Sequence, residues 1–463
     1  MRILILSAKT GGGHMRAAQA LQAVINERDS EATVKIVDGL EYVSHHFNKL
    51  IVDGYKIAAM KTPALYGLFY KASNSDSTMF KLMHKTNSQF AKRFLPLLSD
   101  FRPDVVVTTH PFPTIMFAKL REKGITNIPL VSIITDFAPH SAYLNKGVSH
   151  YVVSSEQMVD ELASVGIDRE VIHPVGIPID PIFYKKDENK DETLRSLGFN
   201  PELKTVLIMA GSFGVTDILK IYENLNEVEL DFQIIVITGK NEKLFNGFNS
   251  ILNLNPDMRI GEAQQGFDDD TELTRKQTKM VVTKPTKLLF FTDEVHKYMH
   301  ISDLIITKPG GLTVAESLAS CLPMAIFKAI PGQETDNSEY LCNNNLAIEI
   351  KKSTAADVVY KLLKYPERLI SMRESCDRLN NKDSALNVYD VIKAAVDEMT
   401  DSAIVNYEAI DLDSAELADE INLDEITSLI ESYRKEFADA EFIMEDIDEA
   451  ELEGTEIIEA FNN

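Results

Sequence analysis

The stretch ILILSAKTGGGH, residues 3–14, decides how the chain begins to fold. Its apolar run, residues 3–6, predicts a buried strand, and the alanine-rich residues after His14 predict a helix. The three glycines between them let backbone N–H groups face a ligand without obstruction by Cβ atoms, and the helix adds its positive N-terminus. Because this positive end disfavours imidazolium, we expect His14 to be a neutral base near pH 7, although a histidine that only caps the turn fits the same pattern.

Short apolar runs separated by helical stretches recur along the chain in two series. Because these runs are apolar throughout instead of alternating, both faces of each strand should be covered, as in parallel α/β sheets. The two series predict two doubly wound domains, with a boundary near the Pro-rich residues 176–183 and the charged residues 185–191. In such sheets ligands bind beyond the carboxyl ends of the strands. The predicted strands are residues 3–6, 34–37, 104–109, 131–135 and 151–153, then 206–209, 233–237, 288–291, 304–307 and 324–327.

The composition is that of a globular protein with an acidic tail. At 463 residues, 44% of them hydrophobic, the chain is long enough for two domains and an appendage. Its three cysteines show no pairing or metal-ligand spacing, and no run approaches the roughly 20 apolar residues that span a bilayer, so we expect a cytosolic protein. Residues 401–463 hold 21 Asp and Glu against 2 Lys and Arg, which places −19 of the net charge of −24 there. An apolar stripe from Leu417 to Phe437 predicts an amphipathic helix in this tail.

Residues 41–98 are basic instead, with eight Lys and Arg, three acids and nine aromatic residues. Each residue alone fits a helix whose aromatic side chains are core and whose lysines are solvated. Together they predict a surface for an anionic membrane. Nucleic acid requires the same charge, but no helix-turn-helix, RRM or zinc-finger pattern supports it. The residues predicted to contact the membrane or the acceptor are Lys49, Lys56, Tyr66, Phe69, Lys71, Lys81 and Lys85.

Further glycine turns follow strands in the second half. TKPGGLTVAE, residues 307–316, offers backbone amides to a phosphate, and AGSFG, residues 210–214, ends another strand. PGQETDN, residues 331–337, adds short polar side chains suited to sugar hydroxyls. Each of these residues alone also fits an ordinary cap. Together they predict a crevice for a phosphorylated sugar.

Two competing sites are disfavoured. A dinucleotide fingerprint would need a third glycine where Arg16 stands, because a large side chain prevents close packing of helix on strand. A metal site is conceivable at the adjacent Asp268, Asp269 and Asp270, but the polar insertion 253–284 around them fits a solvated loop better.

Seven motifs in this order resemble the family 28 glycosyltransferases, and most closely the branch of the monogalactosyldiacylglycerol synthases and processive diacylglycerol glucosyltransferases. The resemblance covers most of residues 1–395. The motifs are SAKTGGGH with the alanines after it, ITDF at 134–137, VGIP at 175–178, MAGS at 209–212, TGKNE at 238–242, ITKPGGLTVAE at 306–316 and PGQETDN at 331–337.

The resemblance implies an α/β fold of GT-B architecture, in which two Rossmann-like doubly wound domains face a central cleft. Residues 1–185 would form the acceptor and membrane-docking domain, 186–400 the UDP-sugar domain and 401–463 an acidic helical tail. His14 and Asp136 would be catalytic, with no essential metal or other cofactor. The nucleotide sugar would lie against Gly12, Gly13, Gly211, Ser212, Phe213, Phe291, Gly310, Gly311, Thr313, Glu316, Gln333, Glu334 and Asn337.

The implied activity is inverting transfer of a hexose, with glucose favoured, from a UDP-sugar to the hydroxyl of diacylglycerol at the inner face of the cell membrane. Galactosyl transfer to diacylglycerol and N-acetylglucosaminyl transfer to a polyprenyl-linked cell-wall precursor remain alternatives. A non-catalytic UDP-sugar sensor that acts through protein partners of the tail is an alternative of a different class. Phe213 stands where the family leads us to expect a histidine. Because anionic lipid repels acidic residues, we expect deletion after Thr400 to increase vesicle binding at low salt.

Overall fold

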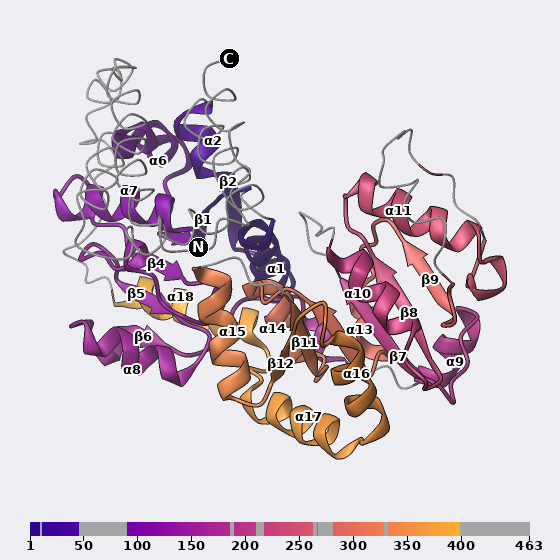
Figure 1. Ribbon diagram of the computed structural model, residues 1–463. Helices are drawn as coiled ribbons and strands as arrows, with labels where there is room; N and C mark the ends of the chain where they lie inside the picture. Colours follow the sequence, from indigo (N-terminus) through magenta and orange to yellow (C-terminus); the bar gives the residue numbers. More distant parts are fainter. Residues whose placement is uncertain are drawn as a thin grey trace, which may run out of the picture.

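The computed structural model describes residues 1–9, 12–45, 90–185, 189–209, 217–262, 266, 281–327 and 332–398. Most of the basic aromatic segment, most of the insertion 253–284 and the acidic tail therefore lie outside the described residues. Figure 1 shows two α/β units, the first running from indigo to magenta and the second from pink to orange.

The first sheet is parallel, with strand order β2-β1-β3-β4-β5-β6. In the central strands, alternate side chains are buried on opposite faces, which explains why these runs are apolar throughout. In β1, Ile3 and Ile5 pack in one cluster with helix α1 (Gly13–Arg28), while Leu4 and Leu6 pack in another with α6 (Leu95–Phe101) and α7 (Pro111–Glu122). The strands are β1 (Arg2–Ser7), β2 (Thr33–Asp38), β3 (Val105–Thr108), β4 (Leu130–Ile133), β5 (His150–Val152) and β6 (Ile172–His173).

The second sheet is also parallel, with order β12-β11-β10-β7-β8-β9. Read from β9, this is the Rossmann order, in which the strand sequence reverses between β7 and β10. Val206 and Ile208 of β7 pack with α10 (Asp217–Asn226), α11 (Glu242–Asn253) and α16 (Ala355–Lys364). Leu207 and Met209 pack on the other face with α13 (Val295–Ile301) and α14 (Gly311–Ala319). The strands are β7 (Lys204–Met209), β8 (Phe232–Ile237), β9 (Thr286–Leu289), β10 (Leu304–Thr307), β11 (Met324–Phe327) and β12 (Ala347–Ile350).

Helices cover both faces of each sheet. In the first unit they are α1 (Gly13–Arg28), α2 (Gly39–Val43), α6 (Leu95–Phe101), α7 (Pro111–Glu122) and α8 (Glu156–Ser164). After them come α9 (Lys190–Ser196), α10 (Asp217–Asn226), α11 (Glu242–Asn253), α13 (Val295–Ile301), α14 (Gly311–Ala319), α15 (Gln333–Asn343), α16 (Ala355–Lys364), α17 (Glu367–Leu379) and α18 (Ser384–Asp397). The fold predicted from the sequence, two Rossmann-like domains, is confirmed.

The last described helix returns to the first sheet. Val388, Ile392 and Ala395 of α18, spaced to share one helix face, pack with Ile3, Val105 and other residues of the first sheet. Figure 1 shows this yellow helix beside the magenta strand β5. Residues 186–400 were predicted as the second domain, yet α18 packs on the first.

The chain therefore crosses between the units twice, and the two crossings are bonded together. Ser384 donates its hydroxyl to the carbonyl of Ile177 at 2.8 Å, and Tyr184 donates to the carbonyl of Asn381 at 2.7 Å. Gly176 has φ of +90°, and a Cβ atom there would lie 2.7 Å from Cβ of Asn381. Glycine is required at this crossing for both conformation and space.

Candidate active site

Two glycine turns lie at the carboxyl ends of strands where the strand order reverses. One follows β1 and leads into α1, whose N-cap residue Gly12 has φ of +84°, a conformation that favours glycine. The other follows β10, and its Gly310 is the N-cap residue of α14. The order reverses between β1 and β3 in the first sheet and between β7 and β10 in the second. Doubly wound sheets bind their ligands at these points.

The N-terminus of α14 packs directly against the first domain. A Cβ atom on Gly311 would lie 1.9 Å from the carbonyl oxygen of Thr135, so only glycine permits this approach. A Cβ atom on Gly13, the first residue of α1, would be in ordinary contact with Leu312 at 3.6 Å. The positive ends of two helices therefore meet at the domain interface.

His14 is held by the first domain through one ring nitrogen. Its Nδ1 lies 2.7 Å from the carbonyl oxygen of Thr109 and 2.8 Å from Oγ1 of Thr135. A carbonyl oxygen only accepts, so Nδ1 carries a proton and donates it. In the neutral ring Nε2 then has the free lone pair and can accept a proton.

Burial keeps this ring neutral. Removal of water lowers the pKa of His14 to about 4, and the bond to Thr109 opposes the shift only in part. Neutrality was predicted from the positive end of the helix, whereas desolvation is the largest cause in the structure. At pH 7 His14 therefore has the protonation state that a general base requires.

A second imidazole, which the sequence analysis missed, lies against the first. The ring of His110 stands edge-on to that of His14, with centroids 4.6 Å apart. Its Nδ1 accepts from the backbone N–H of Phe112 at the start of α7. Burial, and secondarily His14, lower the pKa of His110 well below its ordinary value, so both rings are neutral at pH 7. The available signal was its place directly after the apolar run 104–109, at the carboxyl end of a predicted strand.

Asp136 connects the two domains through amide side chains of α15. Asn337 Nδ2 donates to Asp136 Oδ1 at 3.2 Å, and the side chain of Gln333 also bonds this carboxylate. Asn337 Oδ1 accepts from the backbone N–H of Phe137 at 2.8 Å. Burial raises the pKa of Asp136 to about 6, against the effect of the two amides. The structure thus gathers a predicted catalytic residue and two predicted sugar ligands.

Glu316 lies in α14 at the same interface. Its side chain is 2% exposed, and its Oε1 pairs with Arg16 of α1. Burial raises the pKa of Glu316 to about 7, and the charge of Arg16 opposes that shift. Within the described part of the chain, the buried Oε2 of Glu316 has no hydrogen-bond partner. This ion pair was not predicted from the sequence.

The other predicted ligand residues are spread over the second domain. Phe291, just after β9, is 51% exposed, and Lys240 Nζ lies 5.1 Å from its ring centre. Glu334 Oε2 lies 3.8 Å from Lys308 Nζ, and Thr313 is partly exposed in the first turn of α14. Outside the described residues lie Gly211, Ser212, Phe213, Lys49, Lys56, Tyr66, Phe69, Lys71, Lys81 and Lys85.

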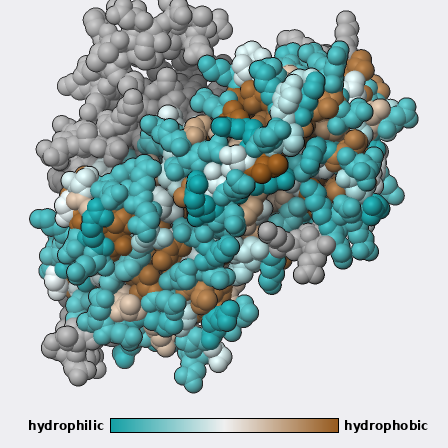
Figure 2. All heavy atoms as spheres, turned by 90° about the horizontal axis from the view of Figure 1, so that it is seen from below, coloured by the Kyte–Doolittle hydropathy of each residue, from teal (hydrophilic) through white to brown (hydrophobic). Residues whose placement is uncertain are grey.

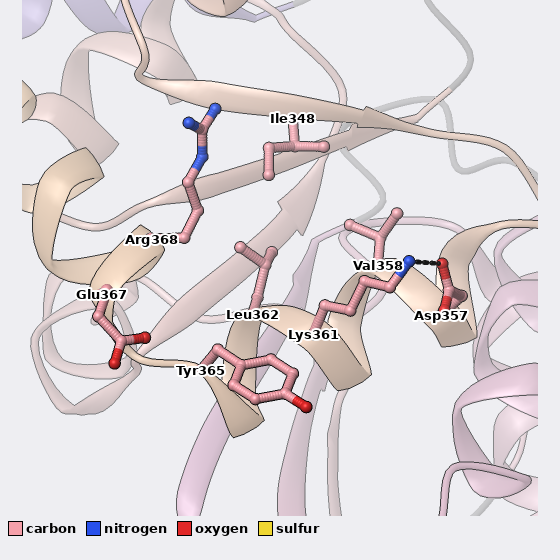
Figure 3. Close-up of a pocket in the computed structure, with 8 residues that line it drawn as sticks. All are labelled: Ile348, Asp357, Val358, Lys361, Leu362, Tyr365, Glu367 and Arg368. Carbon is pink, nitrogen blue, oxygen red and sulfur yellow. Dashed lines mark hydrogen bonds and ion pairs between the residues drawn. The ribbon is translucent and has the colours of Figure 1, made fainter.

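A hollow of about 460 Å³ lies elsewhere, where β12, α16 and the start of α17 meet. Figure 3 shows Tyr365, Leu362 and Arg368 around it, with Lys361 paired to Asp357. None of the predicted site residues lines this hollow. On the face in Figure 2, hydrophilic residues surround several separate apolar patches.

None of the helices in the described residues combines the length and the apolar composition that spanning a membrane requires. Nor do the His, Cys, Asp and Glu side chains of the described residues form a group of three or more that could hold a metal ion. None of the three cysteines, all of which lie in the described residues, forms a disulfide.

Two Rossmann-like domains that meet at their ligand-binding turns define the GT-B class, and solved structures of this class have the same fold. MurG of Acinetobacter baumannii aligns with a TM-score of 0.53 at 14% identity, covering 85% of this chain and 99% of that one. CalG4, the calicheamicin glycosyltransferase, aligns with a TM-score of 0.52 at 12% identity, covering 86% of this chain and 98% of that one.

Sequence comparisons narrow the class to a family. Residues 14–179 match the model of monogalactosyldiacylglycerol synthase, and residues 205–394 match that of the glycosyltransferase family 28 C-terminal domain. A processive diacylglycerol beta-glucosyltransferase of Bacillus pumilus is 26% identical over 87% of this chain and 97% of its own length. A processive diacylglycerol beta-glucosyltransferase of Bacillus cereus is 27% identical over 85% of this chain and 93% of its own length. The chain belongs to the family 28 glycosyltransferases, in the branch that contains the monogalactosyldiacylglycerol synthases.

Proposed function

We propose that this protein transfers glucose from UDP-glucose to the hydroxyl of diacylglycerol, with inversion at the anomeric carbon and without an essential metal ion. The observation that carries the proposal is the neutral His14, fixed through Nδ1 and next to the N-terminus of α14. Both Bacillus relatives are named as diacylglycerol glucosyltransferases, which favours glucose as the sugar and diacylglycerol as the acceptor.

The chemistry follows from the protonation state of His14. The acceptor hydroxyl donates its proton to Nε2 of His14 while its oxygen forms the new bond to the anomeric carbon. On the opposite face of the sugar the bond to the diphosphate oxygen breaks, and UDP leaves with the electron pair. Because attack and departure occur on opposite faces, the configuration inverts. Thr109 stabilises the imidazolium that forms, since its carbonyl accepts from Nδ1 throughout.

The leaving diphosphate gains negative charge as the bond breaks. Backbone amides of Gly310 and Gly311, at the positive end of α14, would stabilise that charge. Fixed dipoles of this kind need no reorganisation during the reaction, and they provide the stabilisation that a metal ion supplies in other enzymes. Asp136 would accept hydrogen bonds from the sugar or the acceptor beside Gln333.

The acceptor places the enzyme on a membrane surface. The basic aromatic segment within residues 41–98 has the charge and the aromatic content for contact with anionic lipid. We therefore propose a peripheral enzyme at the inner face of the cell membrane, where UDP-sugars are available.

The test is transfer of radiolabelled sugar to diacylglycerol in anionic vesicles, with EDTA present throughout. UDP-glucose, UDP-galactose and UDP-N-acetylglucosamine are supplied separately, the last also with a polyprenyl-linked acceptor. Glycolipid from UDP-glucose alone supports the proposal, and product from another donor replaces it with the corresponding transferase. Binding of UDP without turnover of any donor would refute an enzymatic role and favour the sensor alternative.

A further inference from the structure

The ion pair between Arg16 and Glu316 has no part in the chemistry above. It joins residues 300 positions apart, from the second turn of α1 and the second turn of α14. Arg16 is half-exposed, whereas Glu316 is almost completely buried. A pair between two domains at the donor site is more than a surface ion pair, because one partner is desolvated.

Only one of the two carboxylate oxygens of Glu316 has a hydrogen-bond partner among the described residues. Oε1 accepts from Arg16, while the buried Oε2 has no partner among the described residues. An unsatisfied buried carboxylate oxygen is costly, so the site is suited to a ligand that donates hydrogen bonds to it. A ribose carries two adjacent hydroxyls, enough for both oxygens, and Glu316 is one of the residues against which the resemblance places the nucleotide sugar. Arg16 therefore binds the oxygen of Glu316, Oε1, that the second ribose hydroxyl would need.

Release of Arg16 would leave its charge near the donor. A helix rises 1.5 Å per residue, so Glu316 lies only about 7 Å along the axis from the amides of Gly311. The half-exposed side chain can change rotamer without disturbing the core. A guanidinium suits a diphosphate because its planar set of N–H groups matches two phosphate oxygens.

We propose that Arg16 changes partners during the reaction cycle: it pairs with Glu316 in the empty protein, and it binds the diphosphate of the donor once a ribose occupies Glu316. This proposal rests on the proposed function, because it requires a nucleoside diphosphate sugar. In the empty protein the pair holds α1 against α14 and offsets the charge of Glu316. In the loaded protein the same arginine adds a positive charge where UDP leaves.

The proposal separates two ligands that differ only in the diphosphate. With Arg16→Gln, uridine should bind at least as tightly as to the wild type, because no arginine competes for Glu316. UDP should lose a charge-assisted contact, so the ratio of UDP affinity to uridine affinity should fall about 10-fold. Arg16→Lys should give an intermediate ratio, since lysine keeps the charge without the planar geometry. Arg28→Gln, an exposed arginine in the last turn of the same helix, is the matched control and should change nothing.

The measurement is isothermal titration calorimetry of UDP and uridine with the full chain. A ratio that falls in Arg16→Gln but not in Arg28→Gln, with uridine affinity maintained, supports the exchange of partners. An unchanged ratio, or equal losses for both ligands, overturns it and leaves Arg16 a structural residue. If the wild type binds neither ligand, the proposed function itself fails, and that result is distinct from an unchanged ratio.

Discussion

Gly311→Ala tests whether the close approach of the two domains is needed for catalysis. A Cβ atom at this position would lie 1.9 Å from the carbonyl oxygen of Thr135, and real Cβ contacts do not fall below 3.0 Å. The two backbones must therefore separate by about 1.1 Å, and both are main chain, so no rotamer change relieves the overlap. Thr135 also contacts Nδ1 of His14, so the separation moves the proposed base away from the proposed donor site.

Misplacement of reacting groups by 1 Å costs a factor of about 100 in rate. We expect Gly311→Ala to lower kcat for sugar transfer by about that factor, while each domain stays folded. Gly310→Ala is the matched control, because a Cβ atom there meets nothing within 4 Å and φ is −75°. If the diphosphate lies over Gly310, this control weakens UDP binding in calorimetry and leaves the domain contact intact. A kcat for Gly311→Ala within about threefold of the wild type would show that catalysis does not need the close approach of the two domains.

Three further predictions concern the same interface. Because burial raises the pKa of Asp136 from its ordinary 3.8 to about 6, the stability due to its protonated form is complete below about pH 4 and is lost as the pH rises through 6. From pH 4 to pH 8 the unfolding free energy of Asp136→Asn should therefore rise by up to about 3 kcal/mol relative to that of the wild type. Urea denaturation of both proteins at the two pH values measures this difference. A difference that does not change with pH would contradict the prediction. Asn337→Ala leaves the N–H of Phe137 and the carbonyl of Pro309 without their amide partner. The unfolding free energy should therefore fall by about 2–4 kcal/mol. A loss below about 0.5 kcal/mol would show that water replaces the amide. Thr135→Val removes a hydroxyl from Nδ1 of His14 but leaves the bond to Thr109, so kcat should fall less than about 10-fold, and a larger loss would assign tautomer control to Thr135.

The central strands and the edge strands β2 and β9 could be predicted from the sequence, whereas the edge strands β6 and β12 could not. All ten predicted runs overlap strands of the two sheets. β6 was missed because it has only two residues, and β12 because its pattern AIEI alternates, as suits a strand at the edge of its sheet. The apolar face of α18 requires a partner, but nothing in its sequence says that the partner is the first sheet.

The glycine turns could be predicted because strand ends, glycines and helix starts are adjacent in the sequence. The contacts across the interface could not, since Arg16 and Glu316 lie 300 residues apart and Phe137 and Asn337 lie 200 apart. No local pattern encodes such pairs. The pKa of His14 illustrates the same limit, because its main cause is burial between elements that only the folded chain brings together.

Whether His14 is the general base is tested most directly by kcat for His14→Asn together with the UDP affinity of the same variant. The side-chain amide of asparagine can take the place of Nδ1 and donate to the carbonyl of Thr109, but it cannot accept the proton of the acceptor hydroxyl. We predict a loss of about 100-fold to 10,000-fold in kcat for sugar transfer to diacylglycerol, with UDP affinity unchanged within about threefold. A kcat within about threefold of the wild type would contradict the account.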